Sequence, residues 1–210
     1  PAHNTDIEET LGALDDLVRQ GKVRYIGSST FPPSQIVEAQ WAARDRRTAR
    51  FVCEQPPYSL LTRGIEADVL PTCQRHKLAV IPWSPLAGGW LSGKWRKGST
   101  PQSTRAARLP ARYDLSLPAN QKKLEVTEGL ARLAEEAGMS LIHLAVAFVI
   151  RHPAVTSAII GPRTMEQLES QLGAAEVQLS DDLLDRIDAL VPPGQNVNVA
   201  DSGWENPALP

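Results

Sequence analysis

Hydrophobic and polar positions follow two alternating patterns along the 210 residues of the chain. Short runs of consecutive apolar residues are each followed by a longer stretch in which apolar residues recur every three or four positions. The first pattern is typical of a buried β-strand and the second of an amphipathic α-helix. We expect strands at residues 23–26, 51–55, 78–81 and 156–160. Strands that alternate with helices predict right-handed crossovers and a parallel sheet.

The helical stretches carry recognisable ends. The first is expected to begin at a capping box, with Thr5 as the N-cap residue and Glu8 three positions later, and to end before Gly21. Ser180 is expected to cap the last helix. Between these two, helical spacing predicts helices at residues 34–44, 66–76, 119–137, 140–151 and from about 164 to 174.

The stretch from Leu78 to Gly93 changes character where its strand ends. Trp83 and Ser84 follow the apolar residues at once, and Gly88-Gly89 lets the backbone turn tightly and approach a ligand. An aromatic ring, a hydroxyl group and a glycine-rich turn at the carboxyl end of a parallel strand predict the wall of a binding site. The alternative is that Trp83 is simply a core aromatic residue at a strand end.

The length of the chain predicts a single domain over residues 1–210. Residues 87–118 are rich in Gly, Ser, Pro and Arg and show little periodicity, which predicts a long loop of the kind that covers a site. Residues 192–210 are expected to form a polar tail, rich in Pro and Gly, that contains Trp204.

Charge and composition exclude several classes of function. The formal net charge of −2 argues against a nucleic acid partner. The longest apolar run, Leu141 to Ile150, is too short to span a bilayer, and no secretory signal is visible, so no membrane partner is predicted. Without a secretory context, Cys53 and Cys73 predict reduced thiols and a cytoplasmic location. The histidines lack the spacing of metal ligands, so no metal site is predicted.

The strand count leaves two α/β architectures to compare. A doubly wound sheet that binds a dinucleotide normally carries G-x-G-x-x-G after a strand, and this sequence contains no such motif. A (β/α)8 barrel has eight strands in about 250 residues, so the predicted strands amount to half of one.

Four segments carry a resemblance to a known family. They are DIEETLGALDDLVRQGKVRYIGSS near the amino end, EQPPYSLL at 54–61, IPWSPLAGGWLSGK at 81–94 and IIGPRTMEQLESQL at 159–172. In sequence and order they resemble the carboxyl-terminal part of the aldo-keto reductases, and most closely the branch of bacterial reductases and potassium-channel beta subunits. The resemblance implies the (β/α)8 TIM-barrel fold, here as a partial barrel of about strands five to eight. It also implies the cofactor NADP(H).

The resemblance further implies which residues bind that cofactor. Ser29 and Gln55 are expected to hold the nicotinamide carboxamide, with Thr30 where many members have asparagine. Trp83 is expected to stack on the nicotinamide ring. The residues expected along the pyrophosphate are Ser84, Pro85, Leu86, Gly88, Ser92 and Lys94. Those expected at the adenosine and its 2′-phosphate are Gly161, Arg163, Gln167 and Gln171.

Taken without the resemblance, some of these residues have simpler interpretations. Ser29 and Thr30 could cap the next helix, because both follow a strand and precede a predicted helix. Gln55 could bond to a nearby backbone group, as buried amides do. Arg163 could be an ordinary solvated side chain.

The catalytic groups of the family are a tyrosine general acid, a lysine, an aspartate and a histidine, all in the first four strands. The chain is expected to begin after them. His3 lies past the strand end, and Tyr25, Tyr58 and Tyr113 do not match the catalytic position. No catalytic residue is therefore assigned.

The resemblance implies NADP(H)-dependent reduction of aldehydes or ketones to alcohols, with a small-molecule carbonyl compound as the substrate. One alternative is a non-catalytic NADP(H)-binding subunit of a larger assembly. Another is an inactive, truncated half-barrel. Such a half would leave two open sheet edges and would aggregate or pair with a second copy, so a homo-oligomer is also expected.

Overall fold

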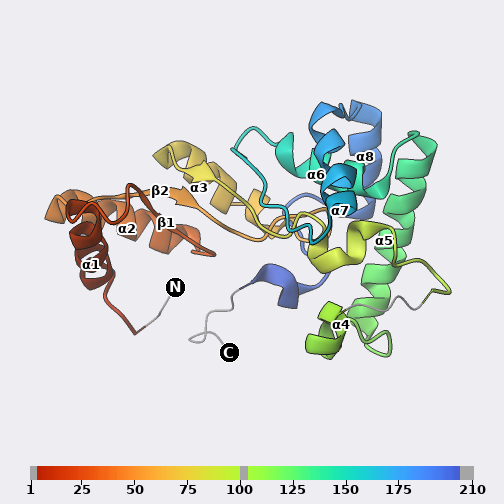
Figure 1. The fold of residues 1–210 in the computed structure, drawn as a ribbon, viewed down its shortest axis with the longest axis horizontal. Helices are drawn as coiled ribbons and strands as arrows, with labels where there is room; N and C mark the ends of the chain where they lie inside the picture. Colours follow the sequence, from red (N-terminus) through yellow and green to blue (C-terminus); the bar gives the residue numbers. More distant parts are fainter. Residues whose placement is uncertain (1–3, 100–103, 204–210) are drawn as a thin grey trace.

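The computed structural model describes residues 4–99 and 104–203, and it contains a three-stranded parallel sheet (Figure 1). The strands are β1 (Ile26–Ser28), β2 (Phe51–Glu54) and β3 (Ala79–Val80), and they lie side by side in chain order. Each strand is followed by a helix or a short helical turn, so the chain is α/β, as the alternating pattern predicts.

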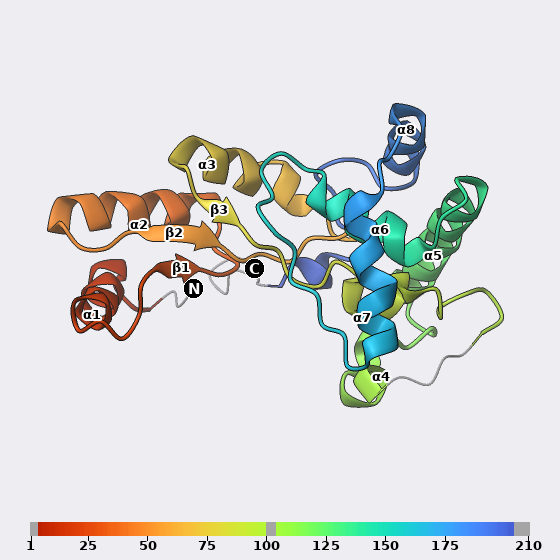
Figure 2. The same ribbon diagram turned by 45° about the horizontal axis from the view of Figure 1, so that its top comes forward.

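Eight α-helices are described within these residues, and most of them follow the predicted ranges. They are α1 (Ile7–Arg19), α2 (Pro33–Arg46), α3 (Val69–His76), α4 (Thr104–Arg108), α5 (Pro118–Glu136), α6 (Leu141–Ile150), α7 (Met165–Leu172) and α8 (Asp181–Leu190). Short 3-10 turns are η1 (Gly64–Glu66), η2 (Ala87–Ser92), η3 (Pro110–Arg112), η4 (Gly173–Glu176) and η5 (Val199–Ser202). The molecule is elongated, with α1 and α2 at one end and α5 to α8 at the other (Figures 1 and 2).

Two of the predicted helix starts are wrong. Asp6, not Thr5, is the N-cap of α1, and its carboxylate accepts a hydrogen bond of 2.8 Å from the backbone N–H of Glu8. The Glu8 side chain pairs with Arg46 of α2, so it is not used in a capping box. The helix expected from residue 66 begins at Val69, because η1 precedes it. Ser180 is confirmed as the N-cap of α8.

The first strand lies further along the chain than the apolar run at residues 23–26 predicts. The backbone N–H of Val23 donates to the carbonyl of Leu17 at the end of α1, so it is not available to the sheet. The carbonyl of Ser28 instead accepts a hydrogen bond of 2.9 Å from the N–H of Gln55. Gly27 and Ser28, expected in the exit loop, are therefore part of β1.

The expected strand at residues 156–160 is also wrong, although the chain there runs parallel to β3. Single bridges join Val155 to Val80 and Ile159 to Trp83. The N–H groups of Thr156 and Ile159 donate to the carbonyls of Val80 and Pro82, each over 2.8 Å. Pro82 has no N–H to donate in return, so a continuous ladder cannot form.

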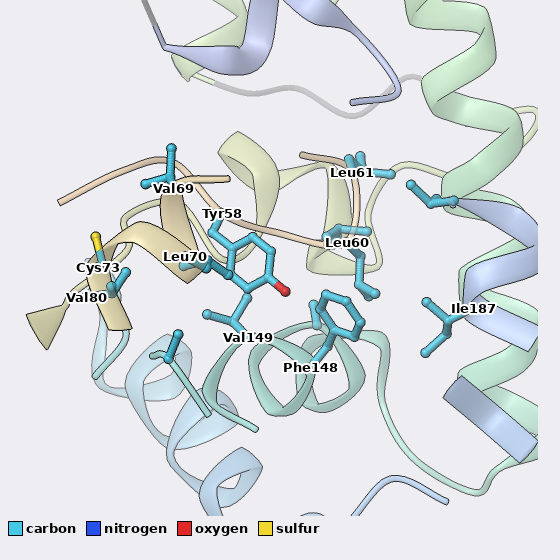
Figure 3. Packing of buried hydrophobic residues seen from close by; sticks show 14 of the residues in the cluster. Tyr58, Leu60, Leu61, Val69, Leu70, Cys73, Val80, Phe148, Val149 and Ile187 are labelled. Carbon is cyan, nitrogen blue, oxygen red and sulfur yellow. The ribbon is translucent and has the colours of Figure 1, made fainter. Parts of the chain in front are cut away.

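The two faces of the sheet differ in burial. Ser28, Glu54 and Val80 are buried on one face, where Val80 belongs to one hydrophobic cluster with Leu70 and Cys73 of α3 and Val149 of α6 (Figure 3). On the opposite face Gly27 is exposed, and Tyr25, two residues before it, has an exposed fraction of 76%. The sheet is therefore covered by helices on one side, and on the other side it is open around β1.

The described part of the predicted covering loop, residues 87–99 and 104–118, includes short helical elements. It contains η2, α4 and η3, and its Trp90, Trp95 and Tyr113 are buried and stacked, with ring centroids 4.4 to 5.7 Å apart. The ammonium group of Lys123 on α5 lies 4.8 Å from the centre of the Trp90 ring. Aromatic residues in an otherwise polar stretch thus build a small core of their own.

The described part of the tail, residues 192–203, is bound to the rest of the chain. The N–H of Val197 donates to the carbonyl of Leu61, and the N–H of Arg63 donates to the carbonyl of Gln195. Asp201 of η5 forms an ion pair of 2.9 Å with Lys123. Trp204 lies outside the described residues, and so does His3.

Within the described ranges, no single helix is long and apolar enough to cross a membrane. Only α5 and α6 taken together, bent by 95° at the break between them, meet that test of length and composition. The same ranges contain no group of three or more His, Cys, Asp or Glu side chains that could hold a metal ion.

Candidate functional site

Hydrogen bonds join the loop after β1 to the loop after β2, and the loop after β2 to the loop after β3. Ser29 follows β1, and its hydroxyl group donates a hydrogen bond of 2.8 Å to the backbone carbonyl of Gln55, which follows β2. The N–H of Trp83, beyond β3, donates to the carbonyl of Pro56 over 3.0 Å. The structure therefore brings together Ser29, Gln55 and Trp83, three residues that the sequence predicts to share one site.

The accessibility of these three residues suits a ligand that lies along the sheet edge. Ser29 is exposed, whereas the side chains of Gln55 and Trp83 are half-buried. Trp83 is thus partly supported by the protein and partly accessible. An aromatic ring with a polar hydroxyl and an amide beside it is a common lining for a small-molecule site.

A buried carboxyl group that the sequence analysis did not single out lies directly beneath this edge. Glu54 has an exposed fraction of 0%. Its two oxygens accept hydrogen bonds from the Ser28 hydroxyl (2.5 Å) and from the backbone N–H of Phe31 (3.1 Å). Burial raises the pKa of this carboxyl group. The one signal in the sequence is a charged residue at the end of an apolar strand.

The tail passes next to Trp83 and Thr30. A Cβ atom built on Gly203 would lie 3.3 Å from Trp83 Cζ2 and 3.3 Å from Thr30 Cγ2. It would also lie 3.1 Å from Pro57 Cγ. Residues from the end of the described chain therefore border the same edge as the strand exits, which the sequence pattern did not predict.

The residues predicted along the pyrophosphate form a tight turn after Trp83. Ser84, Ala87 and Gly88 have positive φ angles of 62°, 47° and 69°, and Ser84 Oγ accepts a hydrogen bond of 2.9 Å from the N–H of Gly88. Ser92 Oγ donates to the carbonyl of Gly89 over 2.7 Å. The turn also includes Pro85, which is buried, and Leu86, which is half-buried. Hydrogen bonds within this turn therefore fix its shape.

Lys94 is exposed just beyond this turn, on a segment tied to α5. Arg96, two residues later, bonds to both carboxylate oxygens of Glu128 over 2.9 and 3.0 Å. These hydrogen bonds hold the pKa of Glu128 at about 2. The ion pair fixes the backbone next to Lys94 and leaves the Lys94 ammonium group in solvent.

Replacing Gly88 by alanine should lower the free energy of unfolding by about 2 kcal/mol, because the backbone there is left-handed and the space is filled. The new Cβ would lie 2.8 Å from the Tyr113 hydroxyl oxygen, which itself donates to the Gly88 carbonyl over 2.9 Å. Urea denaturation of Gly88→Ala, alone and together with Tyr113→Phe, measures the effect. Removal of the hydroxyl should recover part of the loss, and a loss that is the same in both backgrounds would contradict the steric cause.

The residues predicted at the adenosine lie around the start of α7. Gly161 and Arg163 are exposed, and the side-chain oxygen of Gln167 accepts a hydrogen bond of 2.9 Å from the backbone N–H of Arg163. Gln171 is buried, and its amide donates to the carbonyl of Gln167 over 2.8 Å. Arg163 and Gly161 are therefore exposed at this end of the candidate site, whereas the Gln171 amide is engaged within its own helix.

A second buried polar cluster begins in the loop after β2 and was not predicted. Arg63 is buried and bonds to Glu66 over 2.8 Å and to Asp188 of α8 over 2.7 Å. The Tyr58 hydroxyl donates to Glu66 over 2.6 Å, and burial raises the pKa of Tyr58. The cluster borders a cavity of about 250 Å³ that Phe148 also lines. It joins the loop after β2 to the last helix.

Together these features define an α/β protein with a candidate ligand site at the carboxyl ends of parallel strands, where such folds bind their ligands. Comparison with known proteins identifies its family. Residues 1–192 match the Aldo/keto reductase family. The chain belongs to the aldo/keto reductase family, whose fold is a (β/α)8 barrel.

Curated relatives of the chain include both an oxidoreductase and channel subunits. The uncharacterized oxidoreductase YrpG of Bacillus subtilis (strain 168) is 40% identical over 188 residues, which cover 90% of this chain and 55% of that protein. A probable voltage-gated potassium channel subunit beta of Arabidopsis thaliana is 33% identical over 195 residues, with 91% of this chain and 59% of the relative covered. A protein of the same description from Oryza sativa subsp. japonica is 32% identical, with the same coverage. The chain thus spans 55% to 59% of the length of these relatives.

Proposed function

We propose that this chain forms the NADP(H)-binding edge of an aldo-keto reductase that reduces aldehydes or ketones to alcohols. The observation that carries the proposal is the bonding of the three strand exits, which places Ser29, Gln55 and Trp83 on one edge. When bound, the dihydronicotinamide would supply a hydride to a carbonyl carbon. The role of this chain's residues is to hold and orient the cofactor.

The residues present fit a nicotinamide carboxamide. The Ser29 hydroxyl donates its proton to the Gln55 carbonyl, so its lone pairs are left to accept from an amide N–H. The Gln55 side chain carries both a hydrogen-bond donor and an acceptor, so it can pair with the acceptor and the donor of the nicotinamide carboxamide. The half-buried Trp83 ring offers a flat apolar surface for stacking.

The adenosine end is proposed to lie at the start of α7. The positive end of the α7 dipole lies there, and it favours a phosphate group. Arg163 is exposed at this position, two residues before α7 begins, and a guanidinium group pairs well with a phosphate. This arrangement favours NADP(H) over NAD(H), because only NADP(H) carries the 2′-phosphate.

We also propose that the chain corresponds to strands five to eight of the family's barrel, with the catalytic groups outside it. Three strands and the strand-like stretch at residues 155–159 make half of an eight-stranded barrel. The exposed Tyr25 and Gly27 support the proposal, since a closed barrel covers this face of its strands.

Adding NADPH to the 210-residue chain should quench tryptophan fluorescence in a saturable manner. Trp83→Ala should weaken the affinity at least tenfold, because the stacking surface is lost. The matched control is Trp41→Ala, since Trp41 of α2 is 62% exposed and lies outside the strand exits. Equal quenching in Trp83→Ala and the native chain would rule out the stacking role. A folded native chain that does not bind NADPH would remove the proposed function.

A second candidate function is a non-catalytic NADP(H)-binding subunit. It is favoured by two of the relatives, which are described as probable voltage-gated potassium channel subunits beta. The two functions differ in turnover. Oxidation of bound NADPH by a simple aldehyde supports the reductase, whereas tight binding without oxidation supports the subunit.

A further inference from the structure

We propose that Glu54 is a positioning residue for the nicotinamide, because its carboxyl group fixes the turn that presents Ser29 and Thr30. The inference rests on the proposed function and adds a residue to the same site. Glu54 lies on the buried face of the sheet, and its two hydrogen bonds join it to Ser28, the last residue of β1, and to Phe31 in the loop that follows.

The two hydrogen bonds enclose the turn. One oxygen of Glu54 accepts from Ser28, the residue before Ser29, and the other accepts from the backbone N–H of Phe31, the residue after Thr30. A single side chain therefore holds both ends of a four-residue segment. The same strand continues into Gln55, which accepts the Ser29 hydroxyl, so one short stretch of β2 fixes the complete exit of β1.

The turn needs such a support. Thr30 has a φ angle of 58°, in the left-handed region that β-branched residues rarely adopt. Unfavourable backbone conformations persist where the surroundings determine them, and they concentrate at ligand sites. Without both hydrogen bonds, Thr30 is expected to relax toward a negative φ angle, which would move the Ser29 and Thr30 hydroxyl groups off the edge.

A carboxyl group is energetically unfavourable at this buried position. The residue is fully buried beside the apolar Val80, and its two hydrogen-bond donors are uncharged groups. Burying a carboxyl group is unfavourable compared with burying an apolar side chain, and burial raises the pKa of Glu54 accordingly. A side chain with only a packing role would be apolar here, so the two acceptor oxygens have a task that packing does not explain.

The test compares two ligands with each variant of the 210-residue chain. NADPH includes the nicotinamide, whereas 2′,5′-ADP carries the adenosine and the 2′-phosphate without it. Glu54→Leu keeps the volume and removes both acceptors, and it should weaken NADPH binding by about tenfold while it changes 2′,5′-ADP binding less than about twofold. Glu54→Gln retains a side-chain oxygen and should stay within about threefold of the native affinity for NADPH. Glu38→Leu, at an exposed carboxylate on α2, is the matched control.

Three results would overturn the inference and leave the proposed function intact: native affinity for NADPH in Glu54→Leu, equal weakening of both ligands, or a Glu54→Gln variant as weak as Glu54→Leu. If Glu54→Leu does not fold, Ser28→Ala takes its place, since it removes only one of the two hydrogen bonds. It should weaken NADPH binding by about threefold and spare 2′,5′-ADP. A folded native chain that binds no NADPH would overturn the proposed function, and the inference with it.

Discussion

Arg63→Met is expected to lower the free energy of unfolding by about 3 to 5 kcal/mol, because it breaks a buried network and leaves carboxylates without their cation. The Arg63 guanidinium bonds to Glu66, to Asp188 and to the backbone carbonyl of Val191, and it lies 5.0 Å from the ring centre of Phe148. Its side chain is only 5% exposed, so water cannot replace these partners. Urea denaturation followed by circular dichroism measures the change.

Two further variants show whether the geometry or the charge of Arg63 is responsible for the loss of stability. Arg63→Lys keeps the charge but cannot repeat the planar set of hydrogen bonds, so a loss of about 1 to 3 kcal/mol is expected. Arg186→Met, which removes a solvent-exposed pair between α8 and Glu136, should cost no more than about 1 kcal/mol. If Arg63→Met and Arg186→Met are equally stable, the buried network contributes no more than a surface pair, and its role described above is wrong.

Asp201→Asn is expected to lower the free energy of unfolding by about 3 kcal/mol, because it leaves the Lys123 ammonium group buried without a charged partner. The side chain of Lys123 is 2% exposed, and its nitrogen lies 2.9 Å from Asp201 and 3.4 Å from the carbonyl of Arg112. Loss of the pair should also release the tail. Faster cleavage of the tail in limited proteolysis, together with a lower urea midpoint, would show both effects.

The double variant Lys123→Met with Asp201→Asn distinguishes a buried charge from a general loss of packing. It should be more stable than Asp201→Asn alone, since the uncompensated charge is removed. Glu169→Gln, at an exposed position of α7, serves as the surface control and should change stability by less than about 0.5 kcal/mol. A double variant that is less stable than the single one would contradict the charge argument.

The helices could be predicted well from the sequence, and the strands less well. Helical periodicity extends over many residues, so errors at the ends, as at Thr5 or residue 66, leave the helix itself in place. The strands of this sheet have two to four residues, and their limits depend on partners distant in the chain. The N–H of Val23 donates to the carbonyl of Leu17 and is not available to the sheet. Pro82 has no N–H, so the hydrogen-bond ladder beside Ile159 is interrupted.

The residues of the candidate site also divide into those that could be predicted from the sequence and those that could not. Trp83 could be predicted from its position after a strand, because parallel strands end at one edge, whereas Ser29 and Gln55 are expected there from the resemblance to the aldo-keto reductases. Glu54 and Lys123 could not, since a charged side chain in a sequence is expected in solvent. Each is buried because specific donors or acceptors from other parts of the chain meet it. Pairing of that kind leaves no periodic pattern in the sequence.

The binding of the tail has a consequence for the order in which the site is completed during synthesis. The N–H of Arg63 and the carbonyl of Leu61 are paired with Gln195 and Val197, and Gly203 borders the edge at Trp83. A nascent chain leaves the ribosome with its amino end first. The strand exits would therefore be present early, but the finished edge would form only after the last described residues emerge. Under the proposed function, a chain still in synthesis would present the strand exits without the border that Gly203 adds.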